Sequence, residues 1–381
     1  MATTPASGAV AAPIHTDALA ALATPCLIVD VAALTRNLRR AANHVAGTRV
    51  KLRPHFKAHK CTALLRRQLE AGGCSGVTCA TAAEALVLAE ADFDDILVAN
   101  QIVDRHALAT LAAAAGRAHV TVAVDSHVHV GLLQRLAAKE GVDLDVLIEV
   151  DVGLHRGGLP PRSADLLSLA VAVAHAPGLS FAGLQGYEGH AVFVADRAKR
   201  RRLVNAAANV LEHERDRLAA AGFPCRLISG GGTGTFELAI EAGVHDEVQA
   251  GSYPLMDVRY LTLHLMFEPA LYCLASVISR RDDRAVLDCG LKSLSAEYGL
   301  PKATTPQIEC LDLSDEHTQV RLHGVNLAVG DRVTLIPGHV DPTVNLHDTL
   351  FVVDDDEVQP WAVDGRRRYI GDQTRVAEGG K

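Results

Sequence analysis

The sequence predicts an α/β fold, with a (β/α)8 TIM barrel followed by a separate β domain. Between residues 25 and 260, apolar runs of about five residues are each followed by a helical pattern, and this pair repeats about eight or nine times. After residue 260 the helical patterns nearly stop, and β-type runs separated by turns replace them. Such a repeat indicates a parallel sheet with helical crossovers, either closed into a barrel of roughly 240 residues or open and doubly wound. We expect residues 25–260 to form the barrel, and residues 1–24 and 261–381 to form the β domain.

Each element is predicted from its own pattern. The strands are short apolar runs, of which 144–150 is nearly continuous, and the helices have apolar residues at helical spacing. Thr81 is expected to cap a helix that has Glu84 at its third position. The expected barrel strands are 26–30, 52–55, 76–80, 95–99, 120–124, 144–150, 181–187, 226–229 and 247–250; the expected helices are 31–46, 62–71, 81–91, 104–115, 127–138, 164–176 and 195–220; and the expected β-domain strands are 270–280, 284–288, 308–313, 318–322, 332–336 and 349–354.

The composition argues against several classes of function. The chain has 381 residues, 49% of them hydrophobic, and a net charge of −8, which argues against a nucleic-acid-binding protein and against a basic surface that binds membranes. No uncharged apolar run is long enough to span a membrane, and the first fifteen residues lack the pattern of a signal peptide. The eight cysteines include no CxxC pair. We therefore expect reduced thiols and a cytoplasmic protein.

Lys57 is the first candidate catalytic residue. It follows an expected strand and is flanked by His55 and His59, so that the three side chains would share one face if the strand continued. Nearby imidazoles and partial burial would lower the pKa of the lysine, and a neutral amine is what Schiff-base chemistry requires. The stretch is also rich in cationic side chains, so a basic surface loop is the competing interpretation.

The glycine cluster at 229–235 is the candidate phosphate site. Gly231, Gly232 and Thr233 follow a strand, where backbone N–H groups and a hydroxyl can approach an anion. The cluster lacks the GxxxxGK[ST] nucleotide loop, so ATP is not expected. A flexible turn is the alternative. The segment Gly251-Ser252-Tyr253, after the next strand, is a second candidate.

Three further candidates follow two neighbouring strands. Arg156 lies in a glycine-rich turn, and an arginine keeps its charge at any accessible pH. Placed against a pyridine nitrogen, it would donate a hydrogen bond and leave that nitrogen unprotonated. Tyr187 and His190 follow the next strand and are of the types that line pockets. A surface or purely structural role is open for each of them.

His339 and Asp341 form an HxD motif in the expected β domain. On an extended segment the two side chains would share a face. Imidazole and carboxylate together suit Mn, Mg, Co or Zn, and two protein ligands leave positions for water or substrate oxygens. The motif alone is weak, and a structural role for both residues is the alternative.

Taken together, these stretches resemble the fold-type III pyridoxal-phosphate enzymes of the D-threonine aldolase, D-3-hydroxyaspartate aldolase and D-serine dehydratase group. The resemblance runs from about residue 24 to 360 and implies an alanine-racemase-like barrel with a β domain. The segments that carry it are TPCLIVD at 24, RPHFKAHK at 53, EVDVGLHRGG at 149, GLQGYEGH at 183, SGGGTGT at 229, QAGSYPLMD at 249, LDCGLKSLSAEYGLP at 287, SDEH at 314 and PGHVDPTVNLHD at 337.

The resemblance implies a role for each candidate. Lys57 would carry pyridoxal 5'-phosphate as a Schiff base, Arg156 would face its pyridine nitrogen, and Tyr187 would line its pocket. The phosphate and its surroundings would be contacted by Gly231, Gly232, Thr233, Gly251, Ser252 and Tyr253. His339 and Asp341 would bind a divalent metal. The family also implies a homodimer that acts on a small amino-acid substrate.

The HxD pair resembles the aldolase branch, since the dehydratase branch typically has a cysteine where Asp341 stands. The expected activity is that of a lyase, the cleavage of a D-3-hydroxy amino acid to glycine and an aldehyde. A dehydratase on the same scaffold and a non-catalytic pyridoxal-phosphate carrier are the alternatives. Two positions depart from the family pattern, because Ala80 replaces a glutamine and Phe193 replaces the histidine that acts on the hydroxyl. His190 or Glu188, from a shifted position, or a metal-bound water would then take the place of that histidine.

Overall fold

The computed structural model describes residues 17–366, and in this part of the chain two compact units form. One unit comprises residues 41–251 and 364–366, and the other comprises residues 17–40 and 252–363. The expected β-domain segments at 1–16 and 367–381 lie outside the described residues. The described helices include none with the length and apolar character needed to cross a bilayer.

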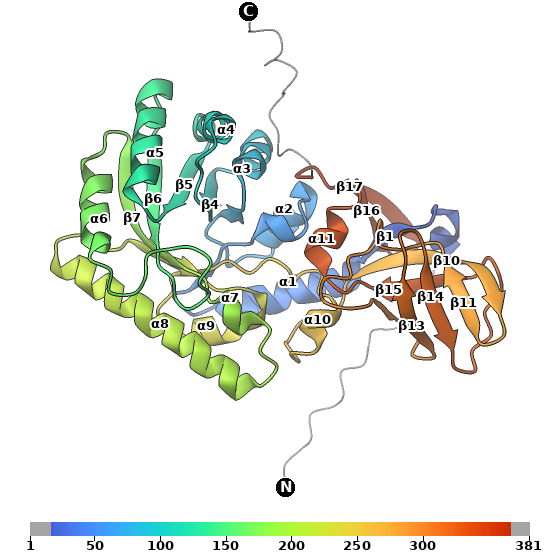
Figure 1. Ribbon diagram of the computed structural model, residues 1–381. Helices are drawn as coiled ribbons and strands as arrows, with labels where there is room; N and C mark the ends of the chain where they lie inside the picture. The colour runs from blue at the N-terminus through green and yellow to red at the C-terminus, as the bar shows by residue number, and fades with distance from the viewer. Residues whose placement is uncertain (1–16, 367–381) are drawn as a thin grey trace, which may run out of the picture. The chain divides into compact units, whose positions relative to one another are not determined.

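The first unit is built on a parallel eight-stranded sheet (Figure 1) with the order β2-β9-β8-β7-β6-β5-β4-β3. The edge strands β2 and β3 are joined by the bridges Leu52↔Cys74 and His55↔Thr78. The sheet therefore closes on itself, and the predicted barrel is confirmed. The strands are β2 (Lys51–Leu52), β3 (Val77–Cys79), β4 (Asp95–Val98), β5 (His119–Val124), β6 (Leu144–Glu149), β7 (Leu179–Gly186), β8 (Leu227–Gly230) and β9 (Glu247–Val248).

A buried ionic network links strands near the point where the barrel closes between β2 and β3. Arg53, only 5% exposed, follows β2 and donates from Nε to Glu247 Oε2 on β9 at 2.6 Å. Its two terminal nitrogens donate to the carboxylate of Asp95 on β4, each at 3.0 Å. A planar guanidinium suits this bidentate contact. One side chain thus joins strands on both sides of the closing seam.

Helices cover the outside of the barrel, as Figure 1 shows for α3 to α6 and α8. Their apolar faces and the strands share one core that includes Leu88, Leu111, Leu133, Leu169 and Leu211. The predicted cap is confirmed, because the Thr81 hydroxyl accepts the N–H of Glu84. The helices are α1 (Val31–Val45), which begins in the other unit, α2 (Thr62–Glu70), α3 (Ala82–Glu90), α4 (Arg105–Ala115), α5 (His127–Glu140), α6 (Asp165–His175), α7 (Gly189–Val192), α8 (Arg197–Ala220) and α9 (Phe236–Ala242), with 3-10 turns η2 (Phe56–Ala58) and η3 (Thr233–Thr235).

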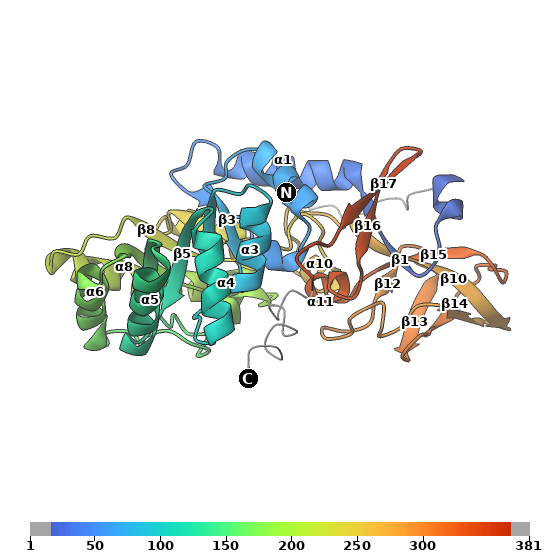
Figure 2. The same cartoon turned by 90° about the horizontal axis from the view of Figure 1, so that it is seen from above.

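The second unit is a mostly antiparallel sheet (Figure 2) with the order β13-β14-β11-β10-β1-β16-β17, in which β15 also pairs with β10 and β12. Ile28, Tyr272, Leu274, Ile336 and Val353 form its core. The elements are η1 (Asp17–Ala21), β1 (Cys26–Asp30), α10 (Val258–Leu261), β10 (Leu271–Arg281), β11 (Arg284–Leu287), β12 (Lys302–Ala303), β13 (Ile308–Leu313), β14 (Thr318–Leu322), β15 (Arg332–Ile336), α11 (Val340–Val344), β16 (Thr349–Asp354) and β17 (Glu357–Ala362).

The sequence-based assignment of residues 26–30 to the barrel is wrong. This strand, β1, pairs antiparallel with β10 and parallel with β16, so it belongs to the second sheet. Its first four residues are buried and it is followed at once by α1, which is also the pattern of a barrel strand. Buried strands of both kinds are continuous apolar runs, so the pattern cannot tell which sheet a strand joins.

Candidate active site

Lys57 lies in the 3-10 turn η2, beyond the carboxyl end of β2, and its side chain is partly buried. The expected alternation of His55, Lys57 and His59 on one strand face is therefore wrong, because a 3-10 turn rotates successive side chains by about 120°. The predicted location at the end of a barrel strand is confirmed. In barrels of this kind the carboxyl ends of the strands carry the chemistry.

His55 is a buried histidine close enough to Lys57 to be affected by its charge. Burial lowers the pKa of its imidazole well below the usual value, and the positive charges of Lys57, His59 and Arg156 lower it further. The ring is therefore neutral at physiological pH. Within the described chain its Nδ1 atom is buried without a hydrogen-bond partner. A buried polar atom of this kind is expected to meet a bound group or an ordered water.

Two further polar side chains of the stretch, His59 and Lys60, have structural contacts. The Nε2 atom of His59 lies 2.9 Å from Gln68 Oε1, and its Nδ1 accepts the N–H of Cys61 at 3.2 Å. Lys60 forms a buried ion pair with Glu84, with Nζ and Oε1 3.2 Å apart. These contacts leave Lys57 as the lysine of this stretch best suited to a covalent role.

The glycine loop after β8 packs closely against the loop after β7. A Cβ atom at position 234 would collide with the carbonyl oxygen of Val192, so only glycine allows this approach. Thr233 is buried within the loop. A Cβ atom on Gly232 would lie 3.2 Å from the ring of Tyr187. The predicted phosphate residues and the predicted pocket tyrosine are therefore neighbours.

Gly251 belongs to the same region. A Cβ atom there would lie 2.9 Å from the carbonyl oxygen of His55, and the N–H of His55 donates to Ala250 at 3.1 Å. Glycine at this position lets the segment after β9 lie directly against the segment that carries Lys57.

Glu188 has a structural role that the sequence did not reveal. Its carboxylate is 1% exposed, accepts the hydroxyl of Thr235 at 2.6 Å and accepts the N–H of Gly231 at 3.2 Å. Both oxygens thus hold the glycine loop in place. Because both oxygens are already engaged, Glu188 is poorly placed to act as the base that replaces the family histidine.

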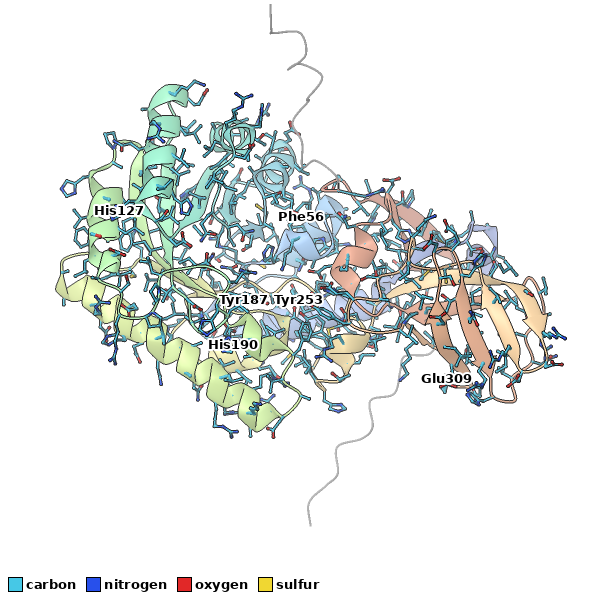
Figure 3. The ribbon with its side chains drawn as sticks, viewed as in Figure 1. Phe56, His127, Tyr187, His190, Tyr253 and Glu309 are labelled. Carbon is cyan, nitrogen blue, oxygen red and sulfur yellow. The ribbon has the colours of Figure 1, made fainter. Side chains whose placement is uncertain are left out.

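Arg156 and Tyr187 lie together after β6 and β7. The Cζ atom of Arg156 is 5.6 Å from the centroid of the Tyr187 ring, a cation–π distance. Figure 3 shows Tyr187 beside α7, which carries His190. The ring of His190 lies next to Gly153, since a Cβ atom there would be 2.9 Å from its Cε1. In the described residues, Nδ1 of His190 is buried without a hydrogen-bond partner.

A buried polar network occupies the inside of the barrel, which sequence reasoning missed. Glu149, at the end of β6, accepts a hydrogen bond from Gln101, and burial raises the pKa of its carboxyl group. Gln249 donates to Gln185 at 3.2 Å and to Ser229 at 2.7 Å. Polar residues at the ends of otherwise apolar strands were the available signal.

These observations fit pyridoxal phosphate in the barrel unit. The partly buried Lys57 supplies a nucleophilic amine, and the glycine loop with Thr233 supplies backbone and hydroxyl donors. His55 and His190 each present a buried nitrogen that has no hydrogen-bond partner among residues 17–366, and Arg156 supplies a fixed positive charge. The residues needed for amine, phosphate and ring contacts are therefore all present.

The second group of candidates lies in the antiparallel unit. His339 directly precedes α11 and Asp341 is in its first turn, so the expected extended conformation across the pair is wrong. The Nε2 atom of His339 lies 3.8 Å from Asp341 Oδ1, too far for a hydrogen bond. Two donors that share a metal at about 2.1 Å lie roughly 3–4 Å apart, so the pair fits a divalent ion.

The surroundings of the pair are polar. Nδ1 of His339 lies 2.8 Å from Glu297 Oε2, and the Ser252 hydroxyl donates to Asp341 at 3.1 Å. Asp257 accepts the N–H groups of Val340 and Tyr260, each at 2.9 Å. Burial raises the pKa of Asp257 to about 6. From 17 to 366, no set of three or more His, Cys, Asp and Glu side chains is arranged to hold a metal, so water or substrate would complete the coordination.

Two predicted phosphate-site residues also lie in this unit. Ser252 makes the hydrogen bond to Asp341 just described, and Tyr253 is 1% exposed with its ring 5.3 Å from that of Phe267. A contact of either residue with the cofactor stays a prediction.

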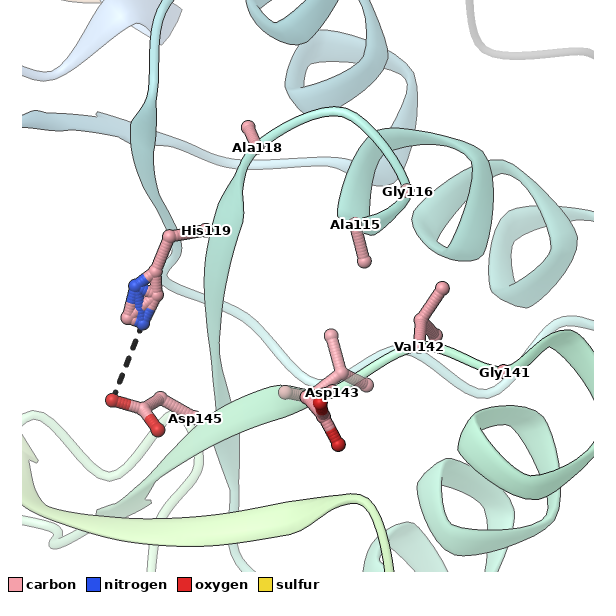
Figure 4. A pocket seen from close by; sticks show the side chains of 9 residues that line it. Ala115, Gly116, Ala118, His119, Gly141, Val142, Asp143 and Asp145 are labelled. Carbon is pink, nitrogen blue, oxygen red and sulfur yellow. Dashed lines mark ion pairs between the residues drawn. The ribbon is translucent and has the colours of Figure 1, made fainter.

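A surface pocket of about 450 Å³ lies elsewhere on the barrel (Figure 4). It is lined by the segments that lead into β5 and β6, and His119 Nε2 lies 3.3 Å from Asp145 Oδ2 at its edge. These are the amino ends of the strands, opposite to Lys57 and the glycine loop. The pocket is therefore separate from the candidate active site.

Comparison with known proteins agrees with this geometry. Residues 29–257 match the family "Alanine racemase, N-terminal domain", and residues 270–353 match "Putative serine dehydratase domain". The chain is 39% identical to D-threonine aldolase of Arthrobacter sp over 359 residues, which covers 92% of this chain and 94% of the relative. It is 34% identical to 3-hydroxy-D-aspartate aldolase of Paracoccus denitrificans (strain Pd 1222) over 356 residues, covering 90% and 92%.

A solved structure gives the same result. The crystal structure of D-threonine aldolase from Filomicrobium marinum superposes with a TM-score of 0.89 and 35% identity, covering 92% of this chain and 97% of that one. A more distant relative, D-threo-3-hydroxyaspartate dehydratase of Delftia sp. (strain HT23), is 28% identical and covers 74% of this chain and 75% of the relative. The chain belongs to the alanine-racemase-like, fold-type III pyridoxal-phosphate family that includes D-threonine aldolase, 3-hydroxy-D-aspartate aldolase and D-serine dehydratase.

Proposed function

We propose that the protein is a lyase that uses pyridoxal phosphate and a divalent metal to cleave a D-3-hydroxy amino acid, of the D-threonine or D-3-hydroxyaspartate type, to glycine and an aldehyde. The observation that carries this proposal is the 39% identity to a D-threonine aldolase over 92% of the chain, which includes both units. The donor pair His339 and Asp341 supports it, because a protein that only carried the cofactor would have no use for a metal.

In this proposal the barrel unit holds the cofactor. Lys57 binds it covalently, and Gly231, Gly232 and Thr233 hold its phosphate, with Gly251, Ser252 and Tyr253 as the second predicted segment. When bound, the cofactor supplies an electron sink for the charge left on Cα when the Cα–Cβ bond breaks. Arg156 would face the ring nitrogen and leave it unprotonated, because a guanidinium donates a hydrogen bond but does not give up its proton.

The second unit supplies the metal donors. A divalent ion held by Nε2 of His339 and a carboxylate oxygen of Asp341 supplies the Lewis acidity that lowers the pKa of a β-hydroxyl. Mn, Mg, Co and Zn are all compatible with one imidazole and one carboxylate.

We assign the transfer of the hydroxyl proton to His190. Its Nδ1 is a buried nitrogen with no hydrogen-bond partner in the described chain, and it lies beside the loop that carries Arg156. Glu188 is the poorer choice because both of its oxygens already accept hydrogen bonds. A histidine is suited to this step because its pKa lies near the operating pH.

A dehydratase that releases ammonia and an oxo acid is the second candidate. The similarity to the Delftia dehydratase favours it, but at lower identity and over less of the chain than the similarity to the aldolases. Both reactions start by activating the same class of substrate, so only the products separate them.

The test is a panel of D- and L-3-hydroxy amino acids incubated with protein that has been loaded with pyridoxal phosphate and Mn²⁺. Glycine, ammonia and oxo acid are measured in the same samples, with and without a chelator. We expect glycine from D substrates only, lost on chelation and restored by added Mn²⁺. Formation of ammonia and an oxo acid without glycine would reject the aldolase activity and support the dehydratase activity.

The proposal also includes an assembly and a location. We propose a homodimer that works in the cytoplasm on small amino acids and binds no nucleic acid, in keeping with the net charge of −8 and the eight free cysteines. Sedimentation of the loaded protein would test the dimer.

A further inference from the structure

Glu297 contacts the metal-site histidine from the side away from Asp341. Its Oε2 lies 2.8 Å from Nδ1 of His339, while Nε2 of the same ring lies 3.8 Å from Asp341. A hydrogen bond at Nδ1 leaves the proton there and the lone pair on Nε2. The ring therefore presents its free lone pair toward the one carboxylate of the HxD motif.

The loop that carries Glu297 is held firmly against the start of α11. The N–H of Ser295 donates to the hydroxyl of Thr343 at 3.0 Å, and that hydroxyl donates to the carbonyl of His339 at 2.6 Å. Nearby, the Nε2 atom of His347 lies 2.8 Å from the carbonyl of Ser293. The loop and the metal-site segment thus form one hydrogen-bonded structure within their unit.

The residue after Glu297 restrains the same ring. The centroid of the Tyr298 ring lies 4.3 Å from that of His339, at an interplanar angle of 36°. With one edge of the imidazole hydrogen-bonded and one face covered, its rotation is restricted. Most exposed ion pairs lack such support, because two mobile side chains must be ordered to make them.

We propose that Glu297 is a positioning residue for the metal, which fixes the tautomer and orientation of His339 so that Nε2 is the donor. This inference rests on the proposed function, since it presumes a divalent ion at His339 and Asp341. Carboxylates that accept the second ring N–H of a metal-binding histidine raise its basicity and orient it, and their loss costs about 10–100-fold in metal affinity.

The test measures binding of Mn²⁺ alone, by the loss of the free-ion EPR signal, to full-length protein that retains pyridoxal phosphate and has been freed of metal. The variants are Glu297→Ala, Glu297→Gln and Glu297→Asp. Glu316→Ala is the matched control, because Glu316 is as exposed as Glu297 (54% against 55%) and pairs with Lys292. The cofactor absorbance and the thermal midpoint of each variant report on the fold.

We expect Glu297→Ala to weaken Mn²⁺ binding about tenfold. Glu297→Gln should lose less, because its amide oxygen still accepts the Nδ1–H, whereas Glu297→Asp is too short and should resemble alanine. A general effect on folding would not spare Mn²⁺ binding in Glu297→Gln while weakening it in both Glu297→Ala and Glu297→Asp. If alanine destabilises the loop, Glu297→Asp still reports the loss of Mn²⁺ affinity. Glu316→Ala should bind as the parent protein does.

Two results would overturn the inference, and they are distinguishable. Unchanged Mn²⁺ binding in Glu297→Ala and Glu297→Asp would reject the positioning role and leave the proposed metal site intact. If the parent protein and His339→Ala bind Mn²⁺ equally, or if neither binds it, the metal site itself is rejected. The metal dependence of the proposed function is then rejected with it.

Discussion

The Nζ atom of Lys60 lies 3.2 Å from Oε1 of Glu84, and the two residues are only 5% and 2% exposed. Glu84 also accepts the N–H of Ala80 at 2.7 Å, so its carboxylate orders the start of α3. Removal of one partner from a charge pair with this little access to water is strongly destabilising, because it leaves the other charge buried and uncompensated.

Replacement of Lys60 by methionine should therefore destabilise the protein by about 3–5 kcal/mol, measured by urea unfolding near neutral pH. Lys292→Met is the control, because Lys292 makes an exposed pair with Glu316 at 3.0 Å and should change the free energy of unfolding by about 1 kcal/mol or less. Equal effects of the two substitutions would show that burial does not set the strength of the Lys60 pair.

Lys57→Ala should remove the visible absorbance of bound pyridoxal phosphate and lower turnover at least about 1000-fold, because the amine proposed to form the covalent bond is lost. Lys51→Ala, an exposed lysine on β2, should leave both properties unchanged. The measurements are the absorbance spectrum before and after borohydride and the rate of glycine formation. A Lys57→Ala protein that is still reduced by borohydride with loss of its absorbance would place the Schiff base on a different lysine.

His190→Asn should lower kcat about 100-fold or more while cofactor binding is retained, because the variant loses the basic ring nitrogen and keeps a neutral polar side chain. His127→Asn is the matched control, since His127 is an exposed histidine of the same barrel unit that contacts Ser168 (Figure 3). Full activity in His190→Asn would assign the proton transfer to a different group.

Glu268 should give a pH-dependent contribution to stability. Its carboxylate contacts Arg36 at 2.9 Å and Arg40 at 2.7 Å, and the hydrogen bonds and charge of Arg36 lower its pKa below the usual 4.5. A depressed carboxyl pKa stabilises the fold above the unfolded-state value, and the stabilisation fades as the pH falls through the folded-state value. Glu268→Gln should therefore cost about 1 kcal/mol at pH 7 and much less at pH 3.5.

The measurement is urea unfolding of Glu268→Gln and the parent protein at both pH values. Glu309→Gln, at a more exposed carboxylate, serves as the control. A difference between Glu268→Gln and the parent that does not shrink at low pH would show that the substitution acts through packing.

Much of the fold followed from local patterns. The runs at 308–313, 318–322, 332–336 and 349–354 have the same limits as β13 to β16, because alternation and turns are encoded within a few residues. The assignment of 26–30 failed because its partners on β10, such as Leu274 opposite Cys26, lie far along the chain and decide which sheet it joins. Short elements such as β12 and α11 were missed, since two to five residues carry too little periodicity to be recognised.

The candidate site divides in the same way. Lys57, Arg156, Thr233 and His339 could be named from their positions after strands or within a motif. The contacts of Glu297, Glu188 and Asp257 could not be predicted, because each of these carboxylates accepts a hydrogen bond from, or lies against, a residue more than 40 positions away in the chain. Glu188, for example, is an ordinary polar residue in the sequence, and only its contacts with Gly231 and Thr235 identify it as the support of the glycine loop.

The link between Arg53 and Glu247 spans 194 positions of the chain. Strands β2 to β8 can pair with their neighbours as synthesis proceeds, but the ring cannot be completed until β9 has left the ribosome. During that interval the open edges of β2 and β8 present unpaired backbone groups, which is the condition under which nascent β structure aggregates. The insertion of β9 between β8 and β2 is therefore the step at which this chain depends most on slow, long-range folding, and variants of Arg53 are expected to show their effect first as a loss of soluble yield.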